Sequence, residues 1–95
     1  MTIRELLKQA EEIWGDEKLS LAQIIVRLGK VFGDICRWER NAPKDRERHS
    51  GEELKKELGN LIFSTIKFSR ELGYDPEECI NLAIKAQKEK VDILN

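Results

Sequence analysis

Apolar residues recur every three to four positions in four separate stretches of this chain, which is the spacing of helices buried along one face. The stretches predict helices over residues 3–14, 20–40, 51–72 and 76–92. No stretch alternates apolar and polar residues in the manner of a half-buried strand. The pattern therefore predicts an all-α protein with the architecture of a four-helix bundle, formed by a single domain over residues 1–95.

Each predicted helix follows a capping-box pattern, in which a side-chain oxygen caps the helix and an acid or amide three residues later reaches back. The four pairs are Thr2 with Glu5, Ser20 with Gln23, Ser50 with Glu53, and Asp75 with Glu78. Gly15 and Gly73 suit positions just past a helix end. The segment "NAPKDRERHS", residues 41–50, is polar and contains a proline, so we expect a loop between the two long helices.

The spacing also predicts which residues face the core. The first helix contributes Ile3, Leu6, Leu7, Ala10, Ile13 and Trp14; the second Leu21, Ile24, Ile25, Leu28, Val31, Phe32 and Ile35; the third Leu54, Leu58, Leu61, Ile62, Thr65, Ser69 and Leu72; the fourth Cys79, Ile80, Ala83, Ile84 and Gln87. Further apolar residues, such as Val26 and Phe63, lie outside these stripes. A helix that is apolar on several sides is usually covered on several sides. In a chain this short we expect a second copy to supply the cover, as a homodimer or a dimer of dimers.

Charge and cysteine content narrow the function classes. The 17 basic and 18 acidic residues leave a net charge of -1, whereas nucleic-acid-binding domains are usually basic, so a nucleic-acid partner is not expected. Cys36 and Cys79 are far apart and suit reduced, partly buried thiols in a cytoplasmic protein. The opening "MTIRELLKQAEEIW" contains acids and does not suit a signal peptide. No apolar stretch approaches the ~20 residues of a membrane span.

Two helices carry polar residues at the same border of their apolar stripes. Because a helix turns about 100° per residue, Val31 and Asp34 lie roughly 60° and 120° away from Leu28, a central stripe residue of the second helix. Glu57 and Asn60 show the same offsets in the third helix, measured from the stripe residue three positions before Glu57. A carboxylate at such a border is held by its helix and can still reach a cation and solvent.

Two segments resemble a known family. "LSLAQIIVRLGKVFGDI" and "EELKKELGNLIFSTIKFSRELGYDPEECINLAIKAQKEK" are similar to the MazG-like all-α nucleoside triphosphate pyrophosphohydrolases, a superfamily that also includes dimeric dUTPases and phosphoribosyl-ATP pyrophosphatases. The similarity spans about residues 20 to 90, and "ELGN" and "LGYDPEE" match well. The resemblance implies an oligomeric helical protein that hydrolyses a nucleoside triphosphate to a monophosphate and pyrophosphate with Mg²⁺ as cofactor.

The resemblance also implies a metal site. Members of that family bind Mg²⁺ through four carboxylates, two from each of two helices, and the matching positions here are Val31, Asp34, Glu57 and Asn60. Valine cannot bind a metal, and the asparagine offers only a neutral oxygen. The resemblance therefore implies Asp34, Glu57 and Asn60 as ligands of an incomplete site, with hydrolysis weakened or lost.

Three lysines are implied as contacts to the substrate phosphates. Lys30 stands where the family often has a further glutamate, and Lys85 and Lys90 fall near its closing basic positions. The alternative for Lys85 and Lys90 is a solvated helix end, where the helix dipole favours cations.

Ordinary structural roles remain open for the same residues. Glu57 suits a metal ligand or an ion pair with a nearby lysine, and Asp34 suits a ligand or a partner of Arg37 or Arg27. Glu53 suits the reciprocal member of the Ser50 capping box.

Two rings and the overall activity also have alternatives. Trp38 suits a core or interface position, or stacking on a base, and His49 suits a solvated loop position, or a phosphate contact. Whether the chain is an enzyme is left open: the alternative function is a non-enzymatic helical module for self-association or for binding a protein.

Overall fold

The structure is a computed structural model that describes residues 1–41 and 49–94, with the side chain of Leu94 left out. Within these ranges it has no strand and four helices: α1 (Ile3–Trp14), α2 (Leu21–Arg40), α3 (Gly51–Glu71) and α4 (Pro76–Leu94). The all-α prediction is confirmed. Most of the predicted loop, residues 42–48, lies outside the described residues.

The predicted caps begin the helices. The Thr2, Ser20 and Ser50 hydroxyls accept hydrogen bonds from the backbone N–H three residues later, at 3.1, 3.2 and 3.1 Å. The Gln23 side chain also accepts from the Ser20 N–H at 2.9 Å, which completes a reciprocal capping box. Each cap satisfies an N–H group that a helix start leaves without an intrahelical acceptor.

The start and end of α4 differ in detail from the prediction. The Asp75 carboxylate accepts from the N–H of Glu77 at 3.0 Å, whereas the predicted box paired it with Glu78. The helix also continues past residue 92 to Leu94, because no glycine or proline ends it there. Gly73, in the turn before α4, has φ 86°, a left-handed conformation that a glycine adopts without strain.

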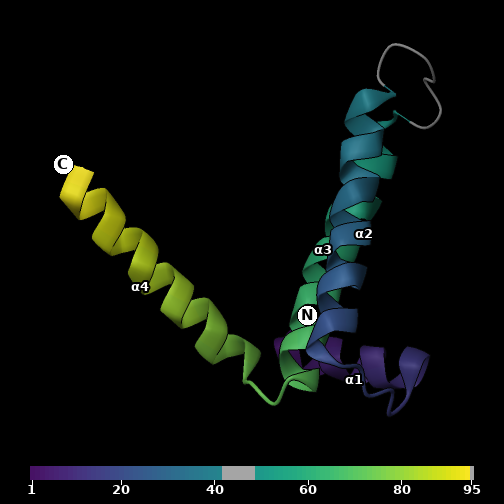
Figure 1. Cartoon of the computed structure of the whole chain (residues 1–95), viewed down its shortest axis with the longest axis horizontal. Helices are drawn as coiled ribbons and strands as arrows, with labels where there is room; N and C mark the ends of the chain where they lie inside the picture. The colour runs from purple at the N-terminus through teal and green to yellow at the C-terminus, as the bar shows by residue number, and fades with distance from the viewer. Residues whose placement is uncertain (42–48, 95) are drawn as a thin grey trace.

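α2 and α3 form an antiparallel hairpin, and α1 crosses the end of the hairpin where α2 begins and α3 ends (Figure 1). Three of the four helices contribute one buried core side chain each: Ala10 of α1, Ile24 of α2 and Phe68 of α3. The core of the described chain is therefore small and lies at one end of the hairpin.

The predicted core stripe of α3 is wrong, because the buried side of this helix is rotated away from the predicted one. Phe68, which the stripe omits, is buried, whereas Leu58 and Ile62, which the stripe includes, are exposed. Leu61 is half-buried and Phe68 is buried, so the covered side of α3 lies nearer to these two residues than to Leu58 and Ile62. Apolar spacing alone cannot tell which part of a wide stripe a neighbouring helix covers.

Similar corrections apply elsewhere. Several residues predicted to face the core are exposed: Ile13 and Trp14 of α1, Leu21, Ile25 and Phe32 of α2, and Ile80 and Ile84 of α4. Cys79 is half-buried as expected, but Cys36 is exposed, and both thiols are free. More apolar surface remains in contact with solvent than the sequence pattern predicts.

α4 accounts for much of this exposure. It leaves the end of α3 at an angle, and its far end lies well away from the hairpin (Figure 1). The radius of gyration is 15.9 Å, compared with about 12 Å for a compact chain of this length. One chain therefore does not bring all four helices into a closed bundle.

Candidate functional site

Trp38 fixes the register between α2 and α3. Its indole N–H donates to the Ser50 carbonyl at 3.0 Å, and its ring stacks on His49 with centroids 3.9 Å apart. Val31 lies seven residues before Trp38, and Glu57 lies seven residues after Ser50. At about 1.5 Å of rise per residue, Val31 and Glu57 are therefore level with each other on the two helices.

This contact gives each ring a structural partner within the chain. Trp38 is half-buried and joins the end of α2 to the start of α3, which is the core or interface role. His49 is half-buried against that ring, so the expectation of a simply solvated histidine is wrong. Both rings therefore contribute to the packing between the end of α2 and the start of α3.

Glu57 is the most buried of the predicted metal ligands. Its side chain is only 14% exposed, and among the described residues no donor reaches its Oε2 atom, which is buried. Its Oε1 atom lies 3.7 Å from the Lys56 ammonium. A buried carboxylate oxygen without a partner costs roughly 1–3 kcal/mol, so this atom is suited to a cation or another donor.

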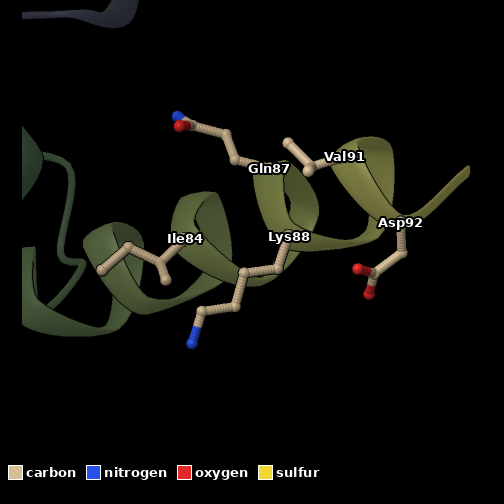
Figure 2. Close-up of a pocket in the computed structure, with 5 residues that line it drawn as sticks. All are labelled: Ile84, Gln87, Lys88, Val91 and Asp92. Carbon is tan, nitrogen blue, oxygen red and sulfur yellow. The ribbon is translucent and has the colours of Figure 1, made fainter. Parts of the chain in front are cut away.

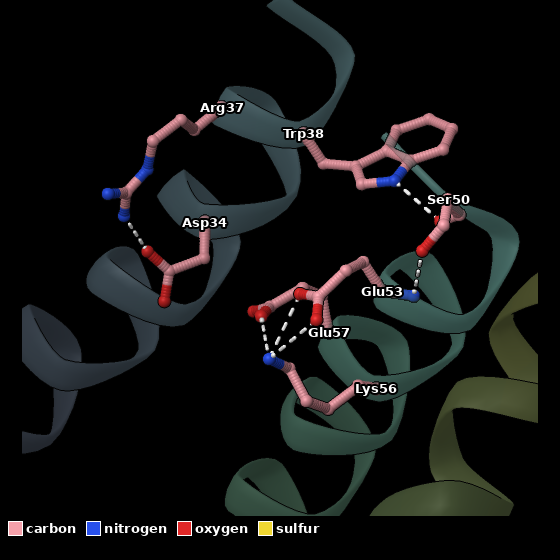
Figure 3. A network of polar contacts seen from close by, with 7 residues as sticks. All are labelled: Asp34, Arg37, Trp38, Ser50, Glu53, Lys56 and Glu57. Atoms are coloured by element: carbon pink, nitrogen blue, oxygen red, sulfur yellow. Dashed lines mark hydrogen bonds and ion pairs between the residues drawn. The ribbon is translucent and has the colours of Figure 1, made fainter. Parts of the chain in front are cut away.

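Lys56 lies beside Glu57 and Glu53 (Figure 3). Its Nζ is 3.0 Å from a Glu53 carboxylate oxygen, so Glu53 binds this lysine in addition to giving its N–H to the Ser50 cap. The pKa of Lys56 is raised, mainly by the hydrogen bond that its ammonium donates to Glu53 and by the charge of Glu53, with a smaller contribution from Glu57. The resulting stabilisation is present at neutral pH and is lost as the pH rises through the raised pKa.

Asp34 extends from the facing helix. Its side chain is 27% exposed and is bound by Arg37, one turn further along α2 (Figure 3). Arg37 is one of the two arginines that the sequence offered as partners of Asp34. The other, Arg27, binds Glu17 instead, at 3.1 Å. A metal ion at Asp34 would have to compete with Arg37 for its carboxylate.

The other predicted site residues are less confined. Asn60 follows Glu57 by one turn and is exposed, as is Lys30 one turn before Asp34. Lys85 and Lys90 are exposed on α4, which diverges from the hairpin. The structure thus places Asp34, Glu57 and Asn60 on the two packed helices and leaves the two α4 lysines on a separate element.

The donor set fits Mg²⁺ only in part. In residues 1–41 and 49–94, no group of three or more His, Cys, Asp or Glu side chains is close enough to hold a metal ion. Two carboxylates and an amide oxygen are hard ligands of the kind Mg²⁺ takes, and this ion commonly keeps water and substrate phosphates as its remaining ligands. Among the described residues, the protein alone therefore does not form a complete metal site.

A second polar cluster lies where α1 crosses α3, and the sequence reasoning missed it. The Lys67 side chain is 9% exposed, and its Nζ binds the Glu71 Oε1 atom at 2.9 Å. The ammonium also lies 4.6 Å from the Phe68 ring centroid and 5.2 Å from that of Trp14. The only sequence signal was the four-residue spacing of Lys67 and Glu71, which is usual for exposed helix pairs.

Searches against protein-family models, curated proteins and solved structures found no match to this chain. In the part of the chain that the structure describes, no helix is both long enough and apolar enough to cross a membrane.

Proposed function

We propose that this chain is a MazG-like protein of the nucleotide pyrophosphohydrolase type in which Mg²⁺-dependent hydrolysis is weakened or lost. The observation that carries the proposal is Glu57, whose carboxylate is nearly buried at the seam of two packed helices with one oxygen lacking a donor among the described residues. Asp34 on the facing helix and Asn60 one turn away supply further oxygen ligands.

Each side chain has a defined role in this proposal. Glu57 and Asp34 would bind Mg²⁺ directly, and the Asn60 amide oxygen would supplement them. The bound ion would neutralise the triphosphate and hold the attacking water. Val31 fills the remaining position of the site with an apolar side chain, which accounts for the expected loss of affinity and rate.

The lysines have lesser roles. Lys30 is exposed on the same side of α2 as Asp34 and is suited to a phosphate contact. Lys85 and Lys90 would reach the phosphates only if α4 approached the hairpin of the same copy or of another.

Calorimetric titration of Mg²⁺ and Mn²⁺, with and without a non-hydrolysable nucleoside triphosphate, tests the proposal. We expect binding by the unchanged protein in the presence of the nucleotide, and loss of that binding in Glu57→Gln. Glu52→Gln is the matched control, because Glu52 lies on the same helix, is exposed and pairs with Lys55. Retention of full metal affinity in Glu57→Gln would contradict the proposed site.

A second candidate function is a non-enzymatic self-association module, and the exposed apolar side chains of α2, α3 and α4 favour it. The same titration separates the two candidates. Absence of metal binding in every condition, in a protein that still self-associates, would favour the second.

A further inference from the structure

The hairpin carries an apolar surface that no other described segment covers. It consists of Leu21, Ile25 and Phe32 from α2 with Leu58 and Ile62 from α3, and we call it the hairpin surface. Phe32 is 57% exposed and Ile62 is 60% exposed. Isolated apolar residues on a surface are ordinary, but a contiguous group of this kind indicates an interaction site.

Helix geometry places these residues together. Ile24 of α2 is buried, and Ile25 and Phe32 lie roughly 100° and 80° from it in the same sense of rotation. Ile62 lies roughly 100° from Leu61, the half-buried residue that faces α2, again in the same sense. Because α2 and α3 are antiparallel, equal offsets from their contact line fall on the same side of the pair.

α4 carries the matching feature. Ile80, Ile84 and Val91 lie within roughly 40° of one another along one side of this helix, and all three are exposed. We call them the α4 stripe. A hollow beside the stripe is lined by Ile84, Val91 and three polar residues, all from α4 itself (Figure 2). No second described element therefore covers this side of the helix.

The exposed area of the whole chain is larger than that of a compact chain of the same mass. The chain exposes 7812 Å², whereas a compact chain of its mass, 11.1 kDa, exposes about 5,700 Å². The excess is roughly 2,000 Å² per chain, and a standard stable interface buries about 800 Å² on each partner. A dimer that removed only half of the excess would already have an interface of ample size.

We propose that two copies form a symmetric dimer in which α4 of each copy docks its stripe on the hairpin surface of the other. Each copy has one surface of each kind, so a two-fold arrangement buries both at once and closes without leaving a free site. An unrelated partner that covered the hairpin surface would leave the α4 stripe in water. Docking of α4 on the other copy also leaves the α2–α3 packing within each copy unchanged.

This dimer leaves the candidate metal site open. Asp34 is offset from the contact line in the opposite sense to the hairpin surface, and Glu57 lies in the seam between the two helices, so neither residue is part of the hairpin surface. Formation of the dimer therefore does not depend on metal binding. Its test measures the mass of the assembly and not the affinity for an ion.

The test compares two variants by light scattering coupled to gel filtration. Ile62→Lys damages only the hairpin surface, and Ile84→Glu damages only the α4 stripe. We expect the unchanged chain to have the mass of two copies, and each variant to dissociate at least about 30-fold more readily, because charge is placed in a desolvated contact. Circular dichroism would show that both variants keep their helix content.

Mixing the two variants tests the exchange itself. A mixed dimer keeps one undamaged contact, between α4 of the Ile62→Lys chain and the hairpin surface of the Ile84→Glu chain. We therefore expect the mixture to form dimers at a concentration at which each variant alone is monomeric. Val26→Lys and Ile93→Glu are controls that should leave the dimer intact, since both residues are exposed apolar positions outside the two surfaces.

Three results would overturn the inference. A monomeric unchanged chain would exclude the dimer. An Ile84→Glu chain that remains as dimeric as the unchanged chain would show that α4 is not part of the contact. Two monomeric variants that fail to dimerise when mixed would exclude the reciprocal exchange.

Discussion

At the scale of the residue, Glu57 combines burial with an incomplete set of partners. Its carboxylate is held between two helices, Lys56 approaches one oxygen at 3.7 Å, and no donor among the described residues approaches the other. The sequence placed Glu57 at the border of a helix face, and the structure keeps it there. Its near burial could not be foreseen, because it depends on the way α2 packs beside it.

Trp38 differs from Glu57, because the polar group of its side chain has a hydrogen-bond partner. We expect Trp38→Phe to lower the free energy of unfolding by about 1 kcal/mol, since it removes the hydrogen bond to the Ser50 carbonyl and retains an aromatic ring. Denaturant unfolding followed by circular dichroism measures the change. Tyr74→Phe, at an exposed position, should change stability little, and equal losses in both variants would contradict the structural role of Trp38.

At the scale of the element, local signals in the sequence located the helices well. The hydroxyl caps of α1, α2 and α3 and the glycine after α1 are read from adjacent residues, so their positions agree with the structure to within a residue. The buried side of α3 depends on a distant segment. Lys67 is the clearest case, because it is buried beside a residue of α1, the Trp14 ring, whose centroid lies 5.2 Å from its ammonium.

The Lys67 and Glu71 pair gives a prediction for α3. Lys67→Met alone should destabilise the protein by about 2–3 kcal/mol, because it leaves the Glu71 carboxylate nearly buried without its cation. The double variant Lys67→Met/Glu71→Leu should recover most of that loss, since both charges are then absent. Thermal unfolding of the two single variants and the double variant measures the coupling. Additive effects would mean that the pair is not coupled in solution.

At the scale of the whole molecule, the chain has four helices, but they do not pack together into a closed bundle. Its small core lies at one end of the hairpin, while α4 and one side of the hairpin keep their apolar side chains in water. The wide apolar faces of the second and third predicted helices indicated this need for cover in advance. The sequence could not say that α4 would stand apart, because the angle of the turn before it depends on packing rather than on the apolar pattern.

The central claim also concerns the whole molecule: we propose that this scaffold carries an eroded nucleotide pyrophosphohydrolase site. If so, Val31→Glu/Asn60→Asp would supply the two missing carboxylates next to Asp34 and Glu57. Asn60→Asp alone should raise Mg²⁺ affinity by roughly tenfold, because ligand charge sets the affinity of such sites. Val31 is half-buried, so the double variant should also lose some stability, and its helix content must be checked first.

The most direct measurement is the release of pyrophosphate from a panel of purine and pyrimidine nucleoside triphosphates by the folded double variant, beside the unchanged protein. We predict release by the double variant with Mg²⁺, little or none by the unchanged protein, and none by the double variant after a further Glu57→Gln change. A folded double variant that binds no Mg²⁺ and releases no pyrophosphate from any nucleotide would contradict the claim.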